Sequence, residues 1–266
     1  MSREIVVLPD SNTIAHEAAE RFVTIAREAI AAQGRFTVAL SGGATPRPLY
    51  SLLASEAYRA RIEWDRLSVF WGDERCVPPD HPDSDFGMAR DLLLSKAPIP
   101  AGNVHRMRGE IDPEQAASEY EQIIRREVPA APGSPPGLQD SPGPGQADSP
   151  VIDLILLGMG ADGHTASLFP GTPALHERTR LVVADYVPKL SAHRLTFTPK
   201  LINAAAHVTF LVVGADKAGT LRAVLEGEFR PDVLPAQIVR PVNGKLTWLV
   251  DRAAAHALSF MGRELG

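Results

Sequence analysis

Short apolar runs alternate with longer amphipathic stretches along this chain. Apolar runs rich in β-branched residues predict buried strands, at residues 5–8, 36–40, 67–71, 152–157, 181–183, 208–213 and 246–250. Stretches with helical spacing of apolar positions predict helices, at residues 11–33, from about 45, 84–95, from 112, 216–226 and 251–261. Strands that alternate with helices are typical of an α/β fold, with a mostly parallel sheet and helices on both faces.

Two of the expected helices have clear end signals. The helix over residues 11–33 stops at Gly34, and a later helix begins with Asp112 as its cap and Pro113 at its first position. The core-facing positions of the first helix share one side: Ile14, Ala18, Phe22, Ile25 and Ala29.

Residues 129–150 interrupt this order. They contain seven prolines and four glycines and almost no large apolar side chain, so they cannot bury enough surface to offset the entropy of ordering. Because the strand pattern resumes unchanged behind them, we expect a mobile surface insertion within a single domain of residues 1–266. A proline-rich docking segment is the alternative, but no clear P-x-x-P array with basic flanks is present.

Composition and charge narrow the function classes. The chain has 266 residues, 44% hydrophobic and 22% charged, which is ordinary for a soluble globular protein with a sizeable core. A formal net charge of −5 without a basic stripe argues against a nucleic-acid partner. An anionic substrate would therefore need local lysines and arginines.

Targeting and redox signals point to a cytoplasmic enzyme. We expect either a monomer or a small homo-oligomer, although no sequence signal decides between them. No apolar run reaches the roughly 18 residues of a membrane span, so no membrane partner is expected. The first residues lead into a strand pattern and not into a signal peptide. Cys76 is the only cysteine, which excludes an internal disulfide and a cysteine-rich zinc site.

The most informative stretch is residues 158–170, Gly-Met-Gly-Ala-Asp-Gly-His-Thr-Ala-Ser-Leu-Phe-Pro. It follows a predicted buried strand, and its glycines allow the turns that present Asp162 and His164 together. Open α/β sheets bind ligands at the carboxyl ends of their strands, and histidine accepts a proton near neutral pH. His164 is therefore a candidate general base, although a loop histidine taken alone more commonly packs or caps.

The same stretch contains the G-x-G-x-x-G spacing of a dinucleotide site. Asp185 follows at about the sequence separation expected for the acidic residue that contacts the ribose. That site requires a continuous helix after the third glycine. Pro170 and Pro173 would break such a helix, so we expect no nicotinamide cofactor.

A second motif, residues 41–46, joins a strand to a predicted helix. Ser41, Gly42 and Gly43 would expose backbone N–H groups, and Thr45 would cap a helix that starts at Pro46. Free amides at the positive end of a helix bind anions, most often phosphate. The motif lacks the Gly-Lys-Ser/Thr ending of a Walker loop, and alone it could be an ordinary turn.

Two further motifs bring charge to the same rim. Asp73 and Arg75 follow a predicted strand in the run Trp-Gly-Asp-Glu-Arg, where Arg75 could clamp a phosphate or polarise a carbonyl. A solvated cluster of ion pairs is the alternative. Lys217 would lie in the first turn of a helix, where a cation is unfavourable unless it reaches an anion.

Together with Arg194-Leu195-Thr196, these motifs resemble the 6-phosphogluconolactonase family over nearly the whole chain. The resemblance implies a modified Rossmann-type α/β fold, shared with the glucosamine-6-phosphate deaminases. It implies hydrolysis of 6-phosphoglucono-δ-lactone to 6-phosphogluconate, the second step of the oxidative pentose phosphate pathway, with no metal and no cofactor. The phosphate would be held by the loop of residues 41–45, Lys217 and Arg194, with Asp73 as a further substrate-binding residue.

The mechanism implied by this resemblance has no covalent intermediate. His164 would take a proton from a water that attacks C1 of the lactone, a contribution of about 10²–10⁴-fold. Asp162 would either orient His164 or brace the loop, and the oxyanion would be stabilised by Arg75 or by glycine amides near residues 160–163. A serine esterase is not expected, because the chain has no G-x-S-x-G elbow.

Two other functions would use similar motifs, an amino-sugar deaminase and a non-catalytic sensor. A deaminase carries Asn-Glu-Pro after its Asp-Gly-His element, whereas this chain has Leu168-Phe169-Pro170, and Phe169 cannot transfer a proton. A non-catalytic sugar-phosphate sensor would also use a phosphate loop. Such sensors usually carry a DNA-reading module, and no basic helical segment precedes residue 5 to supply one, while His164 favours catalysis.

Overall fold

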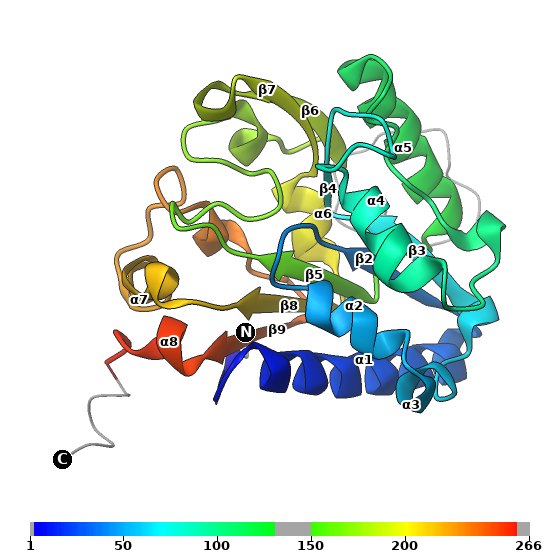
Figure 1. The fold of residues 1–266 in the computed structure, drawn as a ribbon. Coiled ribbons are helices and arrows are strands. Elements are labelled where there is room, and N and C mark those ends of the chain that lie inside the picture. The colour runs from blue at the N-terminus through cyan, green and yellow to red at the C-terminus, as the bar shows by residue number, and fades with distance from the viewer. Residues whose placement is uncertain (1–2, 131–149, 260–266) are drawn as a thin grey trace.

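The structure, a computed structural model, describes residues 3–130 and 150–259. A six-stranded sheet in the order β1-β9-β8-β5-β2-β3 forms its centre, and every neighbouring pair of strands is parallel (Figure 1). This confirms the predicted α/β fold. The strands are β1 (Arg3–Leu8), β2 (Phe36–Leu40), β3 (Leu67–Trp71), β5 (Leu154–Gly158), β8 (His207–Val212) and β9 (Lys245–Asp251).

Each face of the sheet has its own apolar core, because successive side chains of a strand point to opposite faces. In β2, Val38 and Leu40 belong to one core and Ala39 to the other. The first core is covered by α1 (Ser11–Gln33) and α2 (Arg47–Leu53). Helices of the second core are α5 (Pro113–Glu127), α6 (Pro199–Ala204), α7 (Ala218–Glu226) and α8 (Arg252–Ala255).

Helix α1 has the bounds that its sequence predicts. The Asp10 side chain accepts from the N–H of Thr13 at 2.8 Å, and Gly34 ends the helix with φ 77°. Only a residue tolerant of positive φ closes the helix in this way, which is why glycine stands there. Asp112 likewise caps α5, accepting from the N–H of Gln115 at 3.0 Å.

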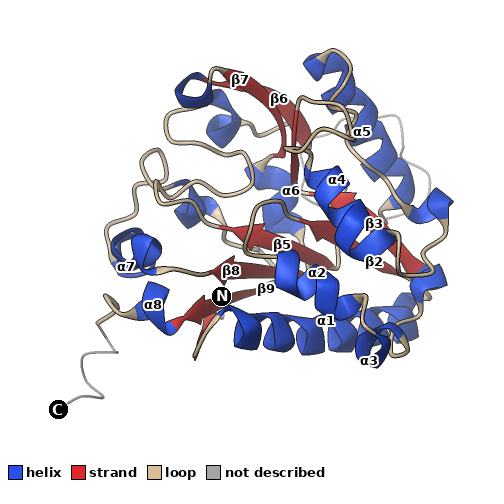
Figure 2. Cartoon of the chain, in the orientation of Figure 1, coloured by secondary structure: helices blue, strands red, loops and turns tan. Residues whose placement is uncertain are grey.

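A second, antiparallel sheet was not predicted (Figure 2). It consists of β4 (Asp73–Arg75), β7 (Ala192–Phe197) and β6 (Val182–Val187). The run over residues 181–183 therefore does not join the parallel sheet. Gly72 links the sheets, since its N–H donates to Leu40 at 2.9 Å and its carbonyl accepts from Phe197 at 2.8 Å. The strands of this sheet mix polar with apolar residues, so periodicity does not mark them.

The helix predicted to start at Pro46 begins later. The N–H of Arg47 donates to the carbonyl of Ala44 at 3.3 Å, which closes a turn. The first helical hydrogen bond then joins the N–H of Tyr50 to the carbonyl of Pro46 at 3.0 Å. Pro46 is thus the cap residue of α2, and Thr45 does not cap the helix as predicted.

The last two predicted helices are shorter than expected. Residues 216–217 belong to the 3₁₀ turn Ala215–Lys217, which precedes α7. Helix α8 ends at Ala255, and the N–H of Ser259 donates to the Glu226 carboxylate at 2.8 Å and not to a helical carbonyl. Residues 260–261 of that prediction lie outside the described residues.

The remaining elements are short. The helix expected over residues 84–95 is α4 (Asp85–Ala89), which continues as a π-helical turn (Arg90–Leu94). One further helix and five 3₁₀ turns complete the described elements: α3 (Glu56–Arg59), Trp64–Arg66, Ala101–Asn103, Pro173–His176, Pro188–Leu190 and Pro235–Ile238.

Most of the predicted insertion, residues 131–149, lies outside the described residues. Its two ends are adjacent, since Ala130 and Pro150 form an isolated antiparallel bridge and the N–H of Val151 donates to Pro129 at 2.9 Å. The chain therefore passes from α5 to β5 without disturbing the order of the sheet.

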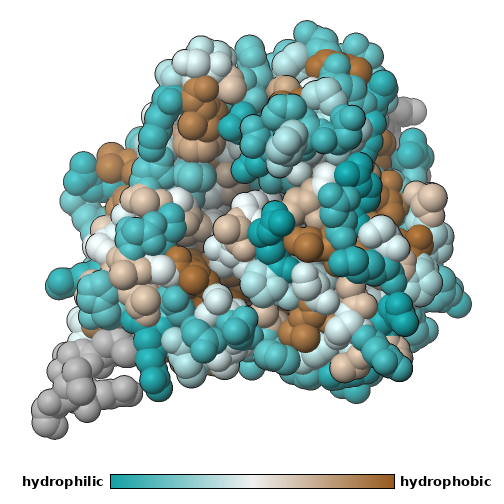
Figure 3. Space-filling model, in the orientation of Figure 1, coloured by the Kyte–Doolittle hydropathy of each residue, from teal (hydrophilic) through white to brown (hydrophobic). Residues whose placement is uncertain are grey.

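The face of the molecule drawn in Figure 3 is largely hydrophilic, with hydrophobic residues in small separate patches. Among the described residues, no helix combines the length and the apolar character that a membrane crossing requires.

Candidate active site

The candidate site lies at the carboxyl ends of four neighbouring strands, β8, β5, β2 and β3. The chain continues from β2 to β3 on one side and from β5 to β8 on the other, so the strand order reverses between β2 and β5. Only Val38 and Ala39 of β2 pair with β5, which lets the two strands separate toward their carboxyl ends. Open α/β sheets bind ligands in a crevice of this kind.

An open cleft of about 820 Å³ occupies this crevice. Loops from four strands and from the second sheet meet around it, because parallel strands end at the same edge. The structure brings every site residue predicted from the sequence to this one cleft: Ser41, Gly42, Gly43, Thr45, Asp73, Arg75, Asp162, His164, Arg194 and Lys217.

His164 is hydrogen-bonded to Asp162, with 2.5 Å between its Nδ1 and the carboxylate Oδ1. An ionised carboxylate can only accept, so Nδ1 carries the proton and Nε2 is the basic nitrogen. Among the described residues nothing hydrogen-bonds to Nε2. The side chain is 31% exposed at the cleft. His164 is therefore oriented to accept a proton from a group in the cleft.

The second oxygen of Asp162 accepts from Lys189 Nζ at 2.7 Å. Burial alone raises the pKa of Asp162, but the hydrogen bonds from Lys189 and His164 outweigh it and hold that pKa well below its usual range. Asp162 thus stays ionised and can stabilise a protonated imidazole. Lys189 was missed from the sequence, because it lies in the turn Pro188–Leu190 between two strands that periodicity did not define.

Two glycines shape the loop that holds this pair. The N–H of Gly160 donates to the carbonyl of His164 at 2.9 Å, and the N–H of Gly163 to that of Gly160 at 3.0 Å. A Cβ on Gly160 would overlap the His164 ring, so only glycine leaves room for it. Both N–H groups are already engaged, which contradicts the prediction that they serve an oxyanion and leaves Arg75 as the candidate donor.

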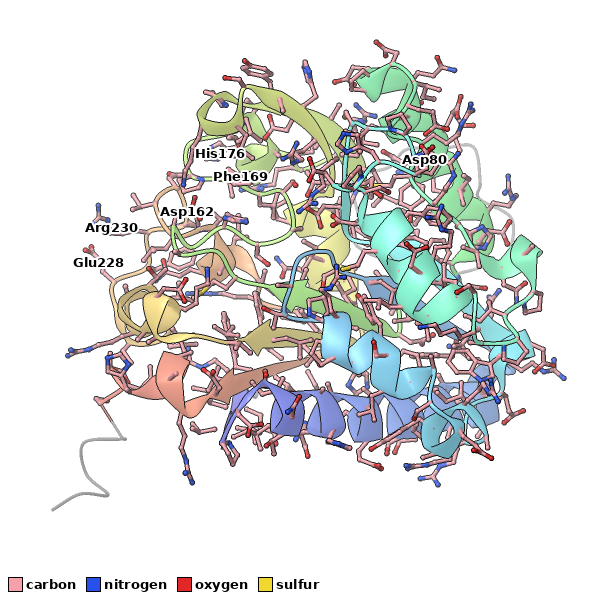
Figure 4. The ribbon with its side chains drawn as sticks, viewed as in Figure 1. Asp80, Asp162, Phe169, His176, Glu228 and Arg230 are labelled. Carbon is pink, nitrogen blue, oxygen red and sulfur yellow. The ribbon has the colours of Figure 1, made fainter. Side chains whose placement is uncertain are left out.

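Phe169 fixes the plane of the histidine ring. The two rings stack with centroids 4.2 Å apart and planes 20° from parallel. Phe169 and Asp162 both lie on the loop that follows β5 (Figure 4). The sequence indicated only that Phe169 stands where a deaminase has an acid. Its contact with His164 is visible only in the folded structure. Residues 161–172 form turns with no continuous helix. The helix that a dinucleotide site requires after the third glycine is therefore missing from this segment, as the prolines predicted.

The loop after β2 presents free donors to the cleft. The buried hydroxyl of Tyr50 accepts from the N–H of Ser41 at 3.0 Å and donates to its carbonyl at 2.7 Å, which holds the loop in place. Gly43 has φ 84°, a conformation that favours glycine. The N–H groups of residues 42–45 donate to no described residue. Because α2 has only seven residues, these amides and not the helix dipole would be the donors to an anion.

The opposite wall of the cleft carries two arginines on adjacent strands. Arg75 of β4 and Arg194 of β7 are register partners in the antiparallel sheet. Burial lowers the pKa of Arg194, and the nearby charge of Arg75 lowers it further. Asp73 beside them accepts from the hydroxyl of Ser167 at 2.7 Å. Two cations that repel each other here would be stabilised by a bound anion.

Lys217 completes the charged rim at the end of β8. Its Nζ lies 3.2 Å from Asp216, whose side chain is 66% exposed. An exposed ion pair contributes little free energy, so Lys217 remains available to a bound anion.

Residues 9–248 match the family described as glucosamine-6-phosphate isomerases/6-phosphogluconolactonase. The chain belongs to this family. A 6-phosphogluconolactonase of Nostoc sp. is 41% identical over 97% of this chain and 100% of its own length. A 6-phosphogluconolactonase structure from Trypanosoma cruzi has a TM-score of 0.82 at 30% identity and covers 97% of both chains.

The deaminase branch of the family shares the fold. A monomeric glucosamine-6-phosphate deaminase has a TM-score of 0.74 over 96% of this chain and 99% of its own, at 22% identity. Together these matches confirm the resemblance and the fold that the sequence motifs predicted.

Proposed function

We propose that this protein is a 6-phosphogluconolactonase, which hydrolyses 6-phospho-D-glucono-1,5-lactone to 6-phospho-D-gluconate in the second step of the oxidative pentose phosphate pathway. The observation that carries the proposal is a single cleft that contains both an oriented base and a set of free backbone N–H groups that could donate hydrogen bonds to an anion. Relatives that bear this name match the chain over almost its full length.

The phosphate of the substrate would bind to the backbone N–H groups of residues 42–45. Lys217 and Arg194 line the same cleft and would add charge-assisted hydrogen bonds. This binding would fix the lactone ring within reach of His164, so that the reaction benefits from positioning.

In the chemical step, Nε2 of His164 would accept a proton from a water as its oxygen attacks C1 of the lactone. Ionised Asp162 would stabilise the imidazolium that forms, and Arg75 would stabilise the negative charge on the C1 oxygen. The bond between C1 and the ring oxygen would then break, and His164 would return its proton to that oxygen. The products are a free hydroxyl group and a carboxylic acid, which ionises to the carboxylate and releases its proton to solvent.

Amino-sugar deamination is the second candidate, because the fold is shared with a deaminase. Deamination requires proton transfers at C2 and ring opening, for which an extra carboxylate next to the histidine is needed. Phe169 occupies that place and stacks on His164. A non-catalytic sugar-phosphate sensor would leave the oriented His164–Asp162 pair without a role.

We expect the purified protein to release protons from freshly made 6-phosphogluconolactone far above the uncatalysed rate. We expect no ammonia and no fructose 6-phosphate from glucosamine 6-phosphate. Appreciable deaminase turnover would instead favour the second candidate. Binding of sugar phosphates without either reaction would favour the sensor.

Removing a cation from the rim should weaken use of the phosphorylated substrate. We expect Lys217→Ala to act mainly on KM, and Arg75→Ala to reduce kcat/KM, each by roughly ten-fold to a hundred-fold, the scale of one lost charge-assisted hydrogen bond. Steady-state kinetics on the lactone would measure both effects. Lys245→Ala is a matched control, because Lys245 is the first residue of β9 and lies at the amino ends of the parallel strands, outside the cleft. Equal hydrolysis of unphosphorylated gluconolactone by the wild-type protein would contradict the anion site.

A further inference from the structure

The mechanism above does not use Asp85, a buried acid of the cleft. Asp85 is the first residue of α4, and its side chain is 3% exposed. Ser84 caps that helix by accepting from the N–H of Gly87 at 3.0 Å, so Asp85 is not needed as a cap. Its carboxyl group lies directly against Gly42, where an added Cβ would overlap it. Asp85 is therefore packed beneath the loop that presents the free amides.

The two oxygens of Asp85 have different surroundings. Oδ1 lies 3.1 Å from Nη1 of Arg75, the arginine assigned to the oxyanion. Oδ2 is buried and has no hydrogen-bond partner among the described residues. A buried ionised oxygen without a donor is strongly unfavourable, whereas a protonated carboxyl group carries no charge to solvate. This geometry favours a neutral Asp85 with its proton on Oδ2.

The charges around Asp85 favour the same state. Burial is the largest influence and the negative charge of Asp73 the next, and together they raise the pKa of Asp85 to about 8 despite Arg75. Titratable and charged groups reach it from three elements: Tyr50 of α2, Asp73, Glu74 and Arg75 of β4, and Arg194 of β7. If every acid here were ionised, three carboxylates would face two arginines in a cleft that has to attract an anion.

We propose that Asp85 is a positioning residue that works as a protonated acid: it holds Arg75 and supports the 42–45 loop without cancelling their attraction for a phosphorylated ligand. When Asp85 ionises, its carboxylate places a negative charge directly beneath the anion-binding loop. The same carboxylate then forms a full ion pair with the Arg75 guanidinium. Affinity for phosphorylated ligands then falls as the pH rises through the pKa of Asp85. This inference rests on the proposed function for its choice of ligand.

The binding experiment is calorimetric titration with 6-phosphogluconate, the product, which avoids spontaneous lactone hydrolysis at alkaline pH. We expect the Kd of the wild-type protein to rise about tenfold from pH 6.5 to pH 9, the scale of one weakened charge-assisted contact. In Asp85→Asn, which keeps the shape and cannot ionise, the two Kd values should agree within about twofold. Asp83→Asn is the matched control, because Asp83 is 73% exposed; it should behave like the wild-type protein.

A wild-type rise that persists undiminished in Asp85→Asn would overturn the inference, since other groups would then cause it. Titration of unphosphorylated gluconate is a further arm. A rise in its Kd equal to that of 6-phosphogluconate would also overturn the inference, because the effect would not involve the phosphate.

A second measurement does not depend on the ligand. A carboxyl group whose pKa is raised on folding stabilises the protein at low pH, and that stabilisation is lost as the pH rises toward the folded pKa. The Tm of Asp85→Asn relative to wild type should therefore increase between about pH 5 and pH 8.5. A difference in Tm that stays constant with pH would overturn a protonated Asp85. Failure of 6-phosphogluconate to bind any variant would instead count against the proposed function.

Discussion

Replacing His164 with alanine should lower kcat for lactone hydrolysis by at least about 100-fold, the effect expected for loss of a general base. Among the described residues, His164 is the one histidine that lines the cleft. Asp162 orients its imidazole through Nδ1, and Nε2 has no hydrogen-bond partner in the described part of the chain. KM should change little, because His164 takes no part in the proposed phosphate binding. The rate of proton release, corrected for uncatalysed hydrolysis, measures the effect.

The same substitution should cost little stability. The variant loses the stack with Phe169, worth about 0.5–1.5 kcal/mol, and a partly exposed hydrogen bond to Asp162. Asp162 keeps its contact with Lys189, so no buried charge is left unpaired. We expect Tm to fall by only a few degrees.

His176→Ala is the matched control for this experiment. That histidine is 64% exposed, lies outside the cleft and pairs with Asp232, so turnover should be unaffected. Near-normal turnover in His164→Ala would remove His164 from the mechanism. Asp73 would then become the leading candidate base, since it lines the same cleft.

Gly160→Ala should be nearly as damaging, although it removes no functional group. A Cβ at this position would overlap the His164 ring and lie 2.7 Å from the Asp162 carboxylate, so the hydrogen-bonded pair would have to move. Displacement of a catalytic group by about 1 Å costs on the order of 100-fold in rate. We expect kcat to fall on that scale, with a smaller change in KM.

Gly219→Ala provides the control for an added methyl group, because a Cβ there meets no atom within 4 Å. It lies near the start of α7, and alanine is a better helix former than glycine, so stability should not decrease. Full activity in Gly160→Ala would show that the close pairing of His164 with Asp162 is not required for turnover. Circular dichroism and Tm would establish that both variants are folded.

Local signals predicted the framework of this protein well. The parallel strands other than β1 appear as apolar runs because they are buried on both faces. Helices α1 and α5 are bounded by capping residues whose side chains or φ angles act within one turn. Interactions of this kind depend only on neighbours in the sequence. The second sheet escaped prediction because its strands mix polar with apolar residues, so no continuous apolar run marks them.

The sequence by itself determined the chemistry available at the site. Nine of the ten predicted residues follow parallel strands, whose carboxyl ends meet at one side of the sheet, so they were expected to converge there. Arg194 is the exception, because it lies within β7 of the second sheet. The tertiary structure alone decided the environment of each group. Lys189 reaches Asp162 from a distant hairpin, and Asp85 packs beneath Gly42, because side-chain contacts and burial arise only when separate elements are brought together.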